Sequence, residues 1–546
     1  MRSKLSVKGF GLNSFRIIFF FLIQFSFSQN GPGGIGSTDG KSALKLWLDA
    51  DQRAFTDTTQ KTAATSGDRL KLWKDLSGSN NDVFAVTDTN RPIFYQNSPY
   101  FNQKAAVRFH RDLDSNCRRN FLVSKDFTKT NDITIYCVFH AVSKSLGNNV
   151  SPFKFKGYHE NMWYNGSGLV DAGVEAIGND VSLAFCDTSI AAGVGDSTTG
   201  FDYSIKIPAA INQTFVASMS KEAWSGLLKI EHNYNFQNPF QAGNQPINQS
   251  EKYFIGSTSD VLTGKTQPFF DGFIATVLVY NKILTTAEKI ILENYLSAKY
   301  DTRLVYNDFF KMDNSENGDF DFEMFGIGKS FDGSLLTKAK GEGIIEMTAR
   351  DLKTGEFVMI AHNGKPLNII DNNLPEGLQF RLQRKWGVST TKENSTVDLV
   401  INLNDMPGFE NLSPVLLIDT DGDSSFENEA LGKGIIQASH VSSDGRVVFA
   451  NVELKDHYIF SFGALKSGCI QDCENYFSPN GDGVADVFYI NKTGNTKIFD
   501  RAGRMIREIN TPAFWDGTTN GGDLAYPGLY FLVSENKTFQ TVTLIR

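Results

Sequence analysis

Short, largely apolar runs, bounded by turn formers, recur along most of the chain. They are legible at Ala105–Phe109, Ile133–Ala141, Thr214–Met219, Lys252–Ile255 and Val415–Asp419. Short runs rich in β-branched and aromatic residues are typical of strands, and Gly, Pro, Asn and Asp on either side favour tight turns. The 45 Phe and 48 Gly residues agree with this pattern, because Phe is frequent in strands and Gly in turns. We therefore predict an all-β protein made largely of β-sandwiches.

Length and charge bound the number of domains and the class of partner. At 546 residues the chain is long enough for roughly three to four domains. The predicted division is a signal peptide at 1–28, a first sandwich at 42–303, a second β-rich domain at 306–465 and a small Ig-like sandwich at 470–546. The net charge is -8 with a pI near 5.5, and no long block of Lys and Arg occurs. We expect no nucleic-acid partner, because such proteins carry basic patches.

The first region ends in a strand followed by a helix. The run Phe270–Tyr280 is apolar and rich in β-branched residues, and Thr285 and Glu288 have the spacing of a capping box. An amphipathic helix is expected to follow, with one apolar face formed by Ile291, Tyr295 and Ala298.

With the opening run Leu46–Ala50, this ending resembles the laminin-G-like, concanavalin-A-like jelly-roll domains of bacterial surface proteins. The resemblance implies the fold more than the ligand, because the family includes lectins, adhesion modules and spacers. Such domains often bind glycans with exposed aromatic rings that pack against the C–H face of a sugar. The candidate ligand-binding residues are Trp163, Tyr164 and Trp224. The alternative is that these rings pack in the core or in loops.

The second region resembles an uncharacterised domain that follows the jelly roll in many Bacteroidetes surface proteins. The residues that carry the resemblance are Phe325–Lys329 (Phe-Gly-Ile-Gly-Lys) and Arg384–Val388 (Arg-Lys-Trp-Gly-Val). That family has no assigned chemistry, so this resemblance implies a fold and no activity.

Three carboxylates in the second region have a spacing that suits a metal ion. Asp419, Asp421 and Asp423 alternate with other residues, which lets short side chains converge on a hard cation such as calcium. The loop departs from an EF-hand, since Ser424 stands where Gly is expected and Ala430 where a bidentate Glu is expected. Calcium is the candidate cofactor here, and the alternative is a solvated turn between two strands.

The most specific motif lies near the C-terminus. Tyr476–Phe488 places a cluster of Pro, Asn, Gly and Asp between aromatic and β-branched residues, which predicts a tight polar loop at the start of a β-rich module. With Phe514–Gly517 and Tyr526–Phe531, it resembles the gliding-motility-associated C-terminal domain, the sorting module of cargo of the Bacteroidetes type IX secretion system. The resemblance implies that the secretion machinery is a partner and that the sorting motif comprises Pro479, Asn480, Gly481, Asp482, Gly483 and Asp486.

The N-terminus agrees with export. Basic residues precede a short apolar run, Ile17–Phe27, and the small residues Ser26 and Ser28 suggest cleavage before Gln29. The alternative is a buried N-terminal helix. No later segment is long and apolar enough for a transmembrane anchor, so we expect a secreted protein at the extracellular cell surface.

The chain contains an odd number of cysteines, so at least one thiol stays unpaired in a monomer. They are Cys117, Cys137, Cys186, Cys469 and Cys473. Cys469 and Cys473 could close a small disulfide loop, whereas a zinc site lacks the required number of ligands.

Asp319–Glu323 alternates acidic and aromatic residues, and a strand there would place its three carboxylates on one face, as glycoside hydrolysis requires. The segment resembles the Glu-x-Asp-x-x-Glu signature of laminarinase-like enzymes, but it starts with Asp and is one residue short. No other nucleophile motif occurs.

We therefore expect a surface protein for adhesion or polysaccharide binding and no enzyme. The alternatives are a glycoside hydrolase and a purely structural or gliding-associated protein.

Overall fold

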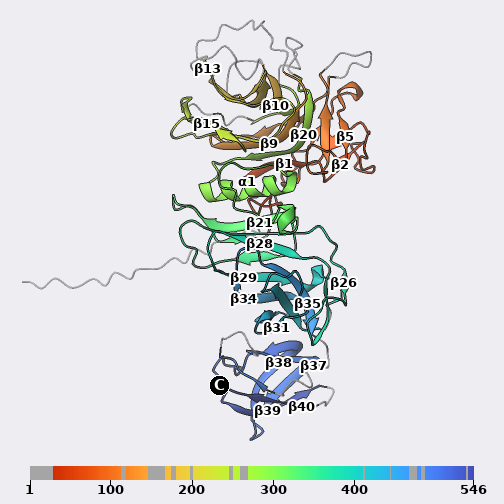
Figure 1. Ribbon diagram of the computed structural model, residues 1–546, viewed down its shortest axis with the longest axis vertical. Helices are drawn as coiled ribbons and strands as arrows, with labels where there is room; N and C mark the ends of the chain where they lie inside the picture. The colour runs from red at the N-terminus through yellow and green to blue at the C-terminus, as the bar shows by residue number, and fades with distance from the viewer. Residues whose placement is uncertain are drawn as a thin grey trace, which may run out of the picture.

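The computed structural model describes residues 29–111, 119–144, 166–173, 180–196, 201–244, 247, 250–258, 269–406, 408–409, 412–442, 444–465, 476–480, 486–535 and 539–546. Three sets of β-sheets follow one another along the long axis of the molecule, and the α-helix α1 lies between the first and the second set (Figure 1). The predicted all-β class is confirmed. None of the helices in these ranges is long and apolar enough to cross a membrane.

The first set is a sandwich of two nine-stranded sheets. The inner sheet, which faces α1, has the order β16 (Asn235–Phe236), β15 (Leu227–His232), β14 (Thr214–Lys221), β9 (Ile133–Ala141), β20 (Gly272–Tyr280), β6 (Ala106–Phe109) and β5 (Ile93–Tyr95), with β1 (Leu44–Asp49) on β20 and β17 (Phe240–Gln241) on β15. The outer sheet has the order β13 (Phe201–Pro208), β12 (Ser189–Asp196), β11 (Val181–Cys186), β10 (Ser167–Ala172), β19 (Tyr253–Ile255), β7 (Leu122–Ser124), β4 (Val83–Phe84), β3 (Leu72–Trp73) and β2 (Ala54–Phe55). A separate pair joins β8 (Phe127–Thr128) to β18 (Ser250–Glu251).

Side chains from the facing sides of these sheets form one apolar core. It includes Trp73, Phe109, Phe139, Phe185 and Ile255, all of them almost fully buried. Because neighbouring side chains of a strand point to opposite faces, the alternate residues of the inner sheet project away from this core. Tyr136, Val138 and Val216 are among them, and they pack toward α1.

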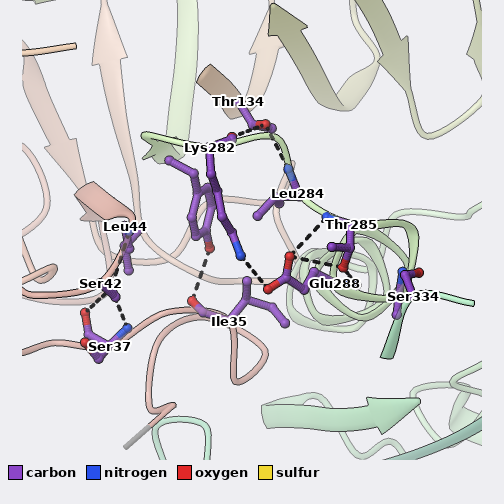
Figure 2. Close-up of polar contacts among 12 residues, drawn as sticks. Ile35, Ser37, Ser42, Leu44, Thr134, Lys282, Leu284, Thr285, Glu288 and Ser334 are labelled. Carbon is purple, nitrogen blue, oxygen red and sulfur yellow. Dashed lines mark hydrogen bonds and ion pairs between the residues drawn. The ribbon is translucent and has the colours of Figure 1, made fainter. Parts of the chain in front are cut away.

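The helix α1 (Thr286–Tyr300) begins at the predicted capping box. The Thr285 hydroxyl accepts a hydrogen bond from the Glu288 amide at 3.3 Å, and the Glu288 carboxylate accepts one from the Thr285 amide at 3.0 Å. Lys282 Nζ donates a hydrogen bond to the same carboxylate at 2.5 Å. In the connection that follows β20, the Thr134 hydroxyl of β9 donates to the Lys282 carbonyl and accepts from the Leu284 amide (Figure 2). The start of α1 is thereby fixed to the inner sheet.

The predicted apolar face of α1 is buried, since Ile291, Tyr295 and Ala298 are each at most 2% exposed, and the helix buries residues on other sides as well. Tyr300 bonds to Thr276 of β20 at 2.5 Å on the side of the inner sheet. Ile291 lies against Gly326 of the second set on the other side. The helix therefore packs against both sets of sheets.

The second set contains a ten-stranded and a five-stranded sheet. The larger has the order β22 (Leu335–Leu336), β21 (Phe322–Lys329), β25 (Glu356–His362), β28 (Trp386–Thr390), β35 (Ile459–Leu465), β30 (Pro414–Asp419), β32 (Gly434–Gln437) and β31 (Ala430–Leu431), with β27 (Leu378–Leu382) on β35 and β26 (Ile369–Ile370) on β27. The smaller has the order β23 (Lys338–Ala339), β24 (Glu346–Thr348), β29 (Ser395–Asn402), β34 (Arg446–Leu454) and β33 (His440–Val441). Short 3₁₀ turns occur at Asp88–Asn90, Ser315–Asn317 and Leu403–Asp405.

One apolar core runs from the inner sheet through α1 into the second set. It contains Trp47 and Tyr136 from the first set, Leu296 from α1, and Phe325 and Trp386 from the second. The segment after Gln29 also contributes to it through Ile35, whose carbonyl accepts a hydrogen bond from the Tyr280 hydroxyl at 3.4 Å (Figure 2). The core therefore crosses the predicted boundary between residues 303 and 306.

The third set is one five-stranded sheet with its own core. Its order is β36 (Tyr476–Phe477), β40 (Phe539–Leu544), β39 (Gly528–Ser534), β37 (Phe488–Phe499) and β38 (Met505–Trp515). Phe477, Trp515 and Tyr530 pack at its centre. Cys117, Cys469 and Cys473 and the predicted signal peptide lie outside the described residues, and Cys137 and Cys186 are buried.

Candidate functional site

A cleft of about 470 Å³ opens at the edge of the first sandwich, and we call it the edge cleft. The edge strands of the two sheets meet there, β13 from the outer sheet and the β15–β16 hairpin from the inner one. Its volume is in the range of about 300–1,000 Å³ that is usual for small-ligand sites. The lining residues are Thr188, Pro208, Ala209, Ala210, Gln213, Phe215, His232, Tyr234 and Asn235.

The wall of the edge cleft is a tight hairpin turn. His232 pairs with Asn235 across the turn, so that Asn233 and Tyr234 form its tip. Asn233 is 6% exposed, and its side chain accepts a hydrogen bond from the Val216 amide at 3.0 Å and donates one to the Arg303 carbonyl at 3.2 Å. These bonds fasten the turn to β14 and to the chain that follows α1. Tyr234 therefore has a fixed position on the cleft wall.

His232 connects this turn to the outer sheet. Its Nδ1 accepts a hydrogen bond from the Tyr234 amide at 3.1 Å, so the proton of the neutral ring is assigned to Nε2, which donates to the Pro208 carbonyl at 3.0 Å. Burial lowers the pKa of His232 below its usual value. The neutral ring is thus the form that the structure accommodates.

Three rings form the apolar part of the edge cleft. Phe215 lies 5.0 Å from His232 and 5.9 Å from Tyr234 between ring centroids, both in edge-to-face geometry. Among the hydrogen bonds of the described residues, neither the Gln213 side chain nor the Asn235 Nδ2 group has a protein partner. A cleft with ring faces beside available amides can hold a ligand that has both C–H faces and hydroxyl groups.

A second pair of exposed rings lies next to the edge cleft. Phe236, which follows Asn235, is 53% exposed and meets Tyr306 edge-to-face at 5.7 Å, where Tyr306 is 56% exposed. These rings extend the aromatic surface beyond the cleft itself.

Of the three predicted ligand-binding residues, the structure describes only Trp224, and it does not line the edge cleft. Trp163 and Tyr164 lie outside the described residues. Trp224 is 90% exposed in the turn between β14 and β15, at the opposite end of β15 from Tyr234. Over the six residues of β15 this is a separation of about 20 Å at about 3.3 Å per residue. Trp224 reaches solvent on its own, away from the other rings.

Sequence reasoning missed Phe215, His232 and Tyr234. The segment His232–Phe236 alternates rings with asparagine, which is a signal that could have been found. The sequence alone does not show that this hairpin packs against the end of β13.

The three aspartates of the predicted calcium site do converge. One oxygen from each of Asp419, Asp421 and Asp423 lies within 4.8 Å of the others. Asp419 is buried and accepts hydrogen bonds from the Gly422 amide at 2.7 Å and the Ser424 amide at 2.8 Å. The Asn428 side chain donates to Asp421 at 2.7 Å and to Asp423 at 3.2 Å. Burial raises the pKa of Asp419, and the two neighbouring carboxylates act in the same direction.

Glu429 is near this loop but has another role. Its carboxylate accepts hydrogen bonds from the Thr420 amide at 2.7 Å and from the Thr420 hydroxyl at 3.0 Å. It thus holds the loop and does not turn toward the three aspartates as an EF-hand glutamate would. Calcium binding at this loop stays a prediction.

The sorting motif begins where the third set begins. Asp486 accepts a hydrogen bond from the Asn480 amide at 2.9 Å, and Pro479 lies close to Gly517. Gly481, Asp482 and Gly483 lie outside the described residues. The described part of the motif therefore follows β36, whose Phe477 is at the centre of the core.

The prediction that Asp319, Asp321 and Glu323 lie on one face of a strand is wrong. The strand β21 begins only at Phe322, and Asp319 and Glu323 have left-handed backbone conformations with φ of 61° and 52°, which breaks the alternation. Asp321 accepts a hydrogen bond from Asn102 of the first set at 2.6 Å. Glu323 instead meets His362 at 2.9 Å and Arg384 at 3.5 Å. These carboxylates connect parts of the structure.

Two family models match parts of the chain. Residues 471–543 match the CHU_C type IX secretion signal domain. Residues 288–457 match a domain of unknown function (DUF8202), and this match begins inside α1. The chain carries a type IX secretion signal domain. This domain marks the chain for export. No curated protein sequence is detectably similar to the chain.

Several solved structures have a distant likeness to the chain. The native heptameric SAP-like pentraxin of Limulus polyphemus is 12% identical over 33% of this chain and 76% of that one, with a TM-score of 0.24. Domain 4 of AbnA, a GH43 extracellular arabinanase of Geobacillus stearothermophilus, in complex with arabinotriose, is 12% identical over 46% and 97%, with a TM-score of 0.27. The binding domain of botulinum neurotoxin DC in complex with SialylT is 10% identical over 82% and 98%, with a TM-score of 0.30.

Proposed function

We propose that this exported chain is a non-enzymatic surface protein that binds polysaccharide through the edge cleft and serves in adhesion. The observation that carries the proposal is the combination of the ring faces of His232 and Tyr234 with the available amides of Gln213 and Asn235. Sugars need both, because their C–H faces pack on rings and their hydroxyls need hydrogen-bond partners. A cleft at the end of a sandwich is also open enough for a chain to enter from solvent.

The arrangement of the carboxylates favours binding over hydrolysis. A glycosidase needs two carboxyl groups about 5–10 Å apart on either side of the scissile bond. The edge cleft lining contains no Asp or Glu among the described residues. A purely structural protein, the other alternative, would need no aromatic cleft.

The test is a glycan array probed with the whole chain and with variants, each in calcium and in EDTA. Tyr234→Ala removes a ring that is part of the cleft wall and is expected to weaken binding about tenfold, which corresponds to roughly 1.4 kcal/mol. Trp224→Ala is the matched control, because it removes an exposed ring at the far end of the same strand. Loss of binding in Trp224→Ala with retention in Tyr234→Ala would move the site to the sequence-predicted residue. Absence of binding to every glycan would favour the structural alternative.

A further inference from the structure

A second and larger cleft, of about 620 Å³, lies where the first and second sets of sheets meet, and we call it the junction cleft. One wall comes from the first set and includes Trp47, Arg53 and Gly78. The other comes from the second set and includes Glu323 and Lys340–Gly343. The core around α1 joins the two walls, so the cleft is a fixed feature of the fold.

The acidic residues of the junction cleft already have partners. Glu342 accepts hydrogen bonds from the Tyr295 hydroxyl and from Gln52 Nε2, both at 2.6 Å. Glu323 is held by His362 and Arg384. Asp75 accepts bonds from the amides of Trp47, Ser77 and Asn81, each at 2.9 Å.

In contrast, two of the three cationic side chains that line the junction cleft have no side-chain partner among the described residues. Lys74 pairs with Asp82 at 3.0 Å. Arg53 and Lys340 take part in none of the ion pairs or side-chain hydrogen bonds found among the described residues. They come from opposite walls, so an anionic group between them could meet both.

A buried donor in the lining also lacks a partner. Trp47 is 2% exposed, and its indole Nε1 makes no hydrogen bond among the described residues. The indoles of Trp73 and Trp515, by comparison, donate to the carbonyls of Asp49 at 3.0 Å and Thr518 at 2.8 Å. A buried N–H group without an acceptor costs about 1–3 kcal/mol, which a ligand acceptor or a bridging water would recover.

We propose that the junction cleft binds an acidic oligosaccharide, with a uronate carboxylate between Arg53 and Lys340. The side chains of Asn30, Gln52 and Asn80 line the same cleft and suit the hydroxyls of such a sugar. The nearby carboxylates of Glu323 and Glu342 disfavour an ion with two or more charges, such as a phosphate ester, and favour one charge per sugar. The proposal does not depend on the edge cleft.

The test is isothermal titration calorimetry of the whole chain with tetragalacturonate, and with maltotetraose as the neutral probe. We expect saturable binding of tetragalacturonate alone, weakened at least tenfold in Arg53→Gln/Lys340→Gln and by raised salt, because both cations are near solvent. Lys433→Gln, a change to an exposed lysine of the second set, should leave this binding unchanged. Circular dichroism and thermal unfolding would verify that the double variant is folded.

Three results would overturn the proposal. The first is equal binding of the neutral tetrasaccharide, and the second is unchanged affinity in the folded Arg53→Gln/Lys340→Gln variant. The third is the absence of binding to tetragalacturonate at millimolar concentration. Loss of glycan binding in Tyr234→Ala with tetragalacturonate binding retained would uphold both clefts as separate sites.

Discussion

The Tyr295 hydroxyl in α1 donates a hydrogen bond to the Glu342 carboxylate, with 2.6 Å between the two oxygens. This bond joins the helix that closes the first set to the loop between β23 and β24 of the second. Burial raises the pKa of Glu342 above its usual value. The relationship indicates that α1 belongs to both sets, and that the two fold as one unit.

A fragment that ends at Arg303 should therefore lack a stable, cooperatively folded structure. The segment 42–303 keeps α1 but loses the sheet that covers Ile291 and Tyr295, so an apolar face becomes exposed. We expect this segment to bind the dye ANS and to aggregate, whereas the segment 29–465, which retains the whole core, unfolds cooperatively. A soluble, cooperatively unfolding 42–303 fragment would contradict the shared core.

Glu293 of α1 should give the stability of the protein a distinctive pH dependence. Burial raises its pKa from 4.5 to about 7, and Tyr136 of β9 donates a hydrogen bond to it at 3.3 Å. Because the folded-state pKa is the higher one, this stabilisation is present below pH 4.5 and is lost as the pH rises through about 7. The loss is at most about 3.5 kcal/mol, at about 1.4 kcal/mol per pKa unit.

Glu293→Gln is the matched variant, since glutamine keeps the acceptor for Tyr136 and has no titrating group. Urea unfolding between pH 4.5 and 7.5 should show a smaller decrease of the unfolding free energy in this variant than in the parent. Identical slopes in the two proteins would show that Glu293 does not titrate in this range.

Asp49 and Lys299 form an ion pair between β1 and α1 that should be sensitive to the loss of one partner. Asp49 is fully buried, and Lys299 also contacts Asp51 at 3.3 Å. Asp49→Asn removes a negative charge beside the buried Lys299 ammonium and is expected to lower the free energy of unfolding by about 3 kcal/mol. Asp49→Asn/Lys299→Met removes both charges and should cost less than the sum of the single changes in denaturant unfolding. Additive costs would mean that the two residues are not coupled.

The fold class could be predicted from the sequence because local residue patterns determine it. Ile133–Ala141 was predicted as a strand and is β9, and Thr285 and Glu288 were predicted as a capping box and form one. The burial of both faces of α1 was not predictable in this way, since it depends on the packing of β21 from a distant part of the chain. The edge cleft escaped prediction for the same reason, because Pro208 and His232 become neighbours only when the two sheets stack.

His232 should make the edge cleft sensitive to acid, with the opposite sign to Glu293. Its pKa is lowered in the folded protein because it is partly buried, so its contribution is complete above the usual value of 6.5 and is lost as the pH falls through the lower folded-state pKa. Protonation would place a hydrogen on Nδ1, where the Tyr234 amide now donates, and so would release the turn that carries Tyr234. Glycan binding measured from pH 7.5 to 5 should therefore weaken on acidification in the parent protein. His232→Gln, which retains a side-chain acceptor but does not titrate, should bind with little change over this range, and an equal loss in both proteins would assign the effect to another group.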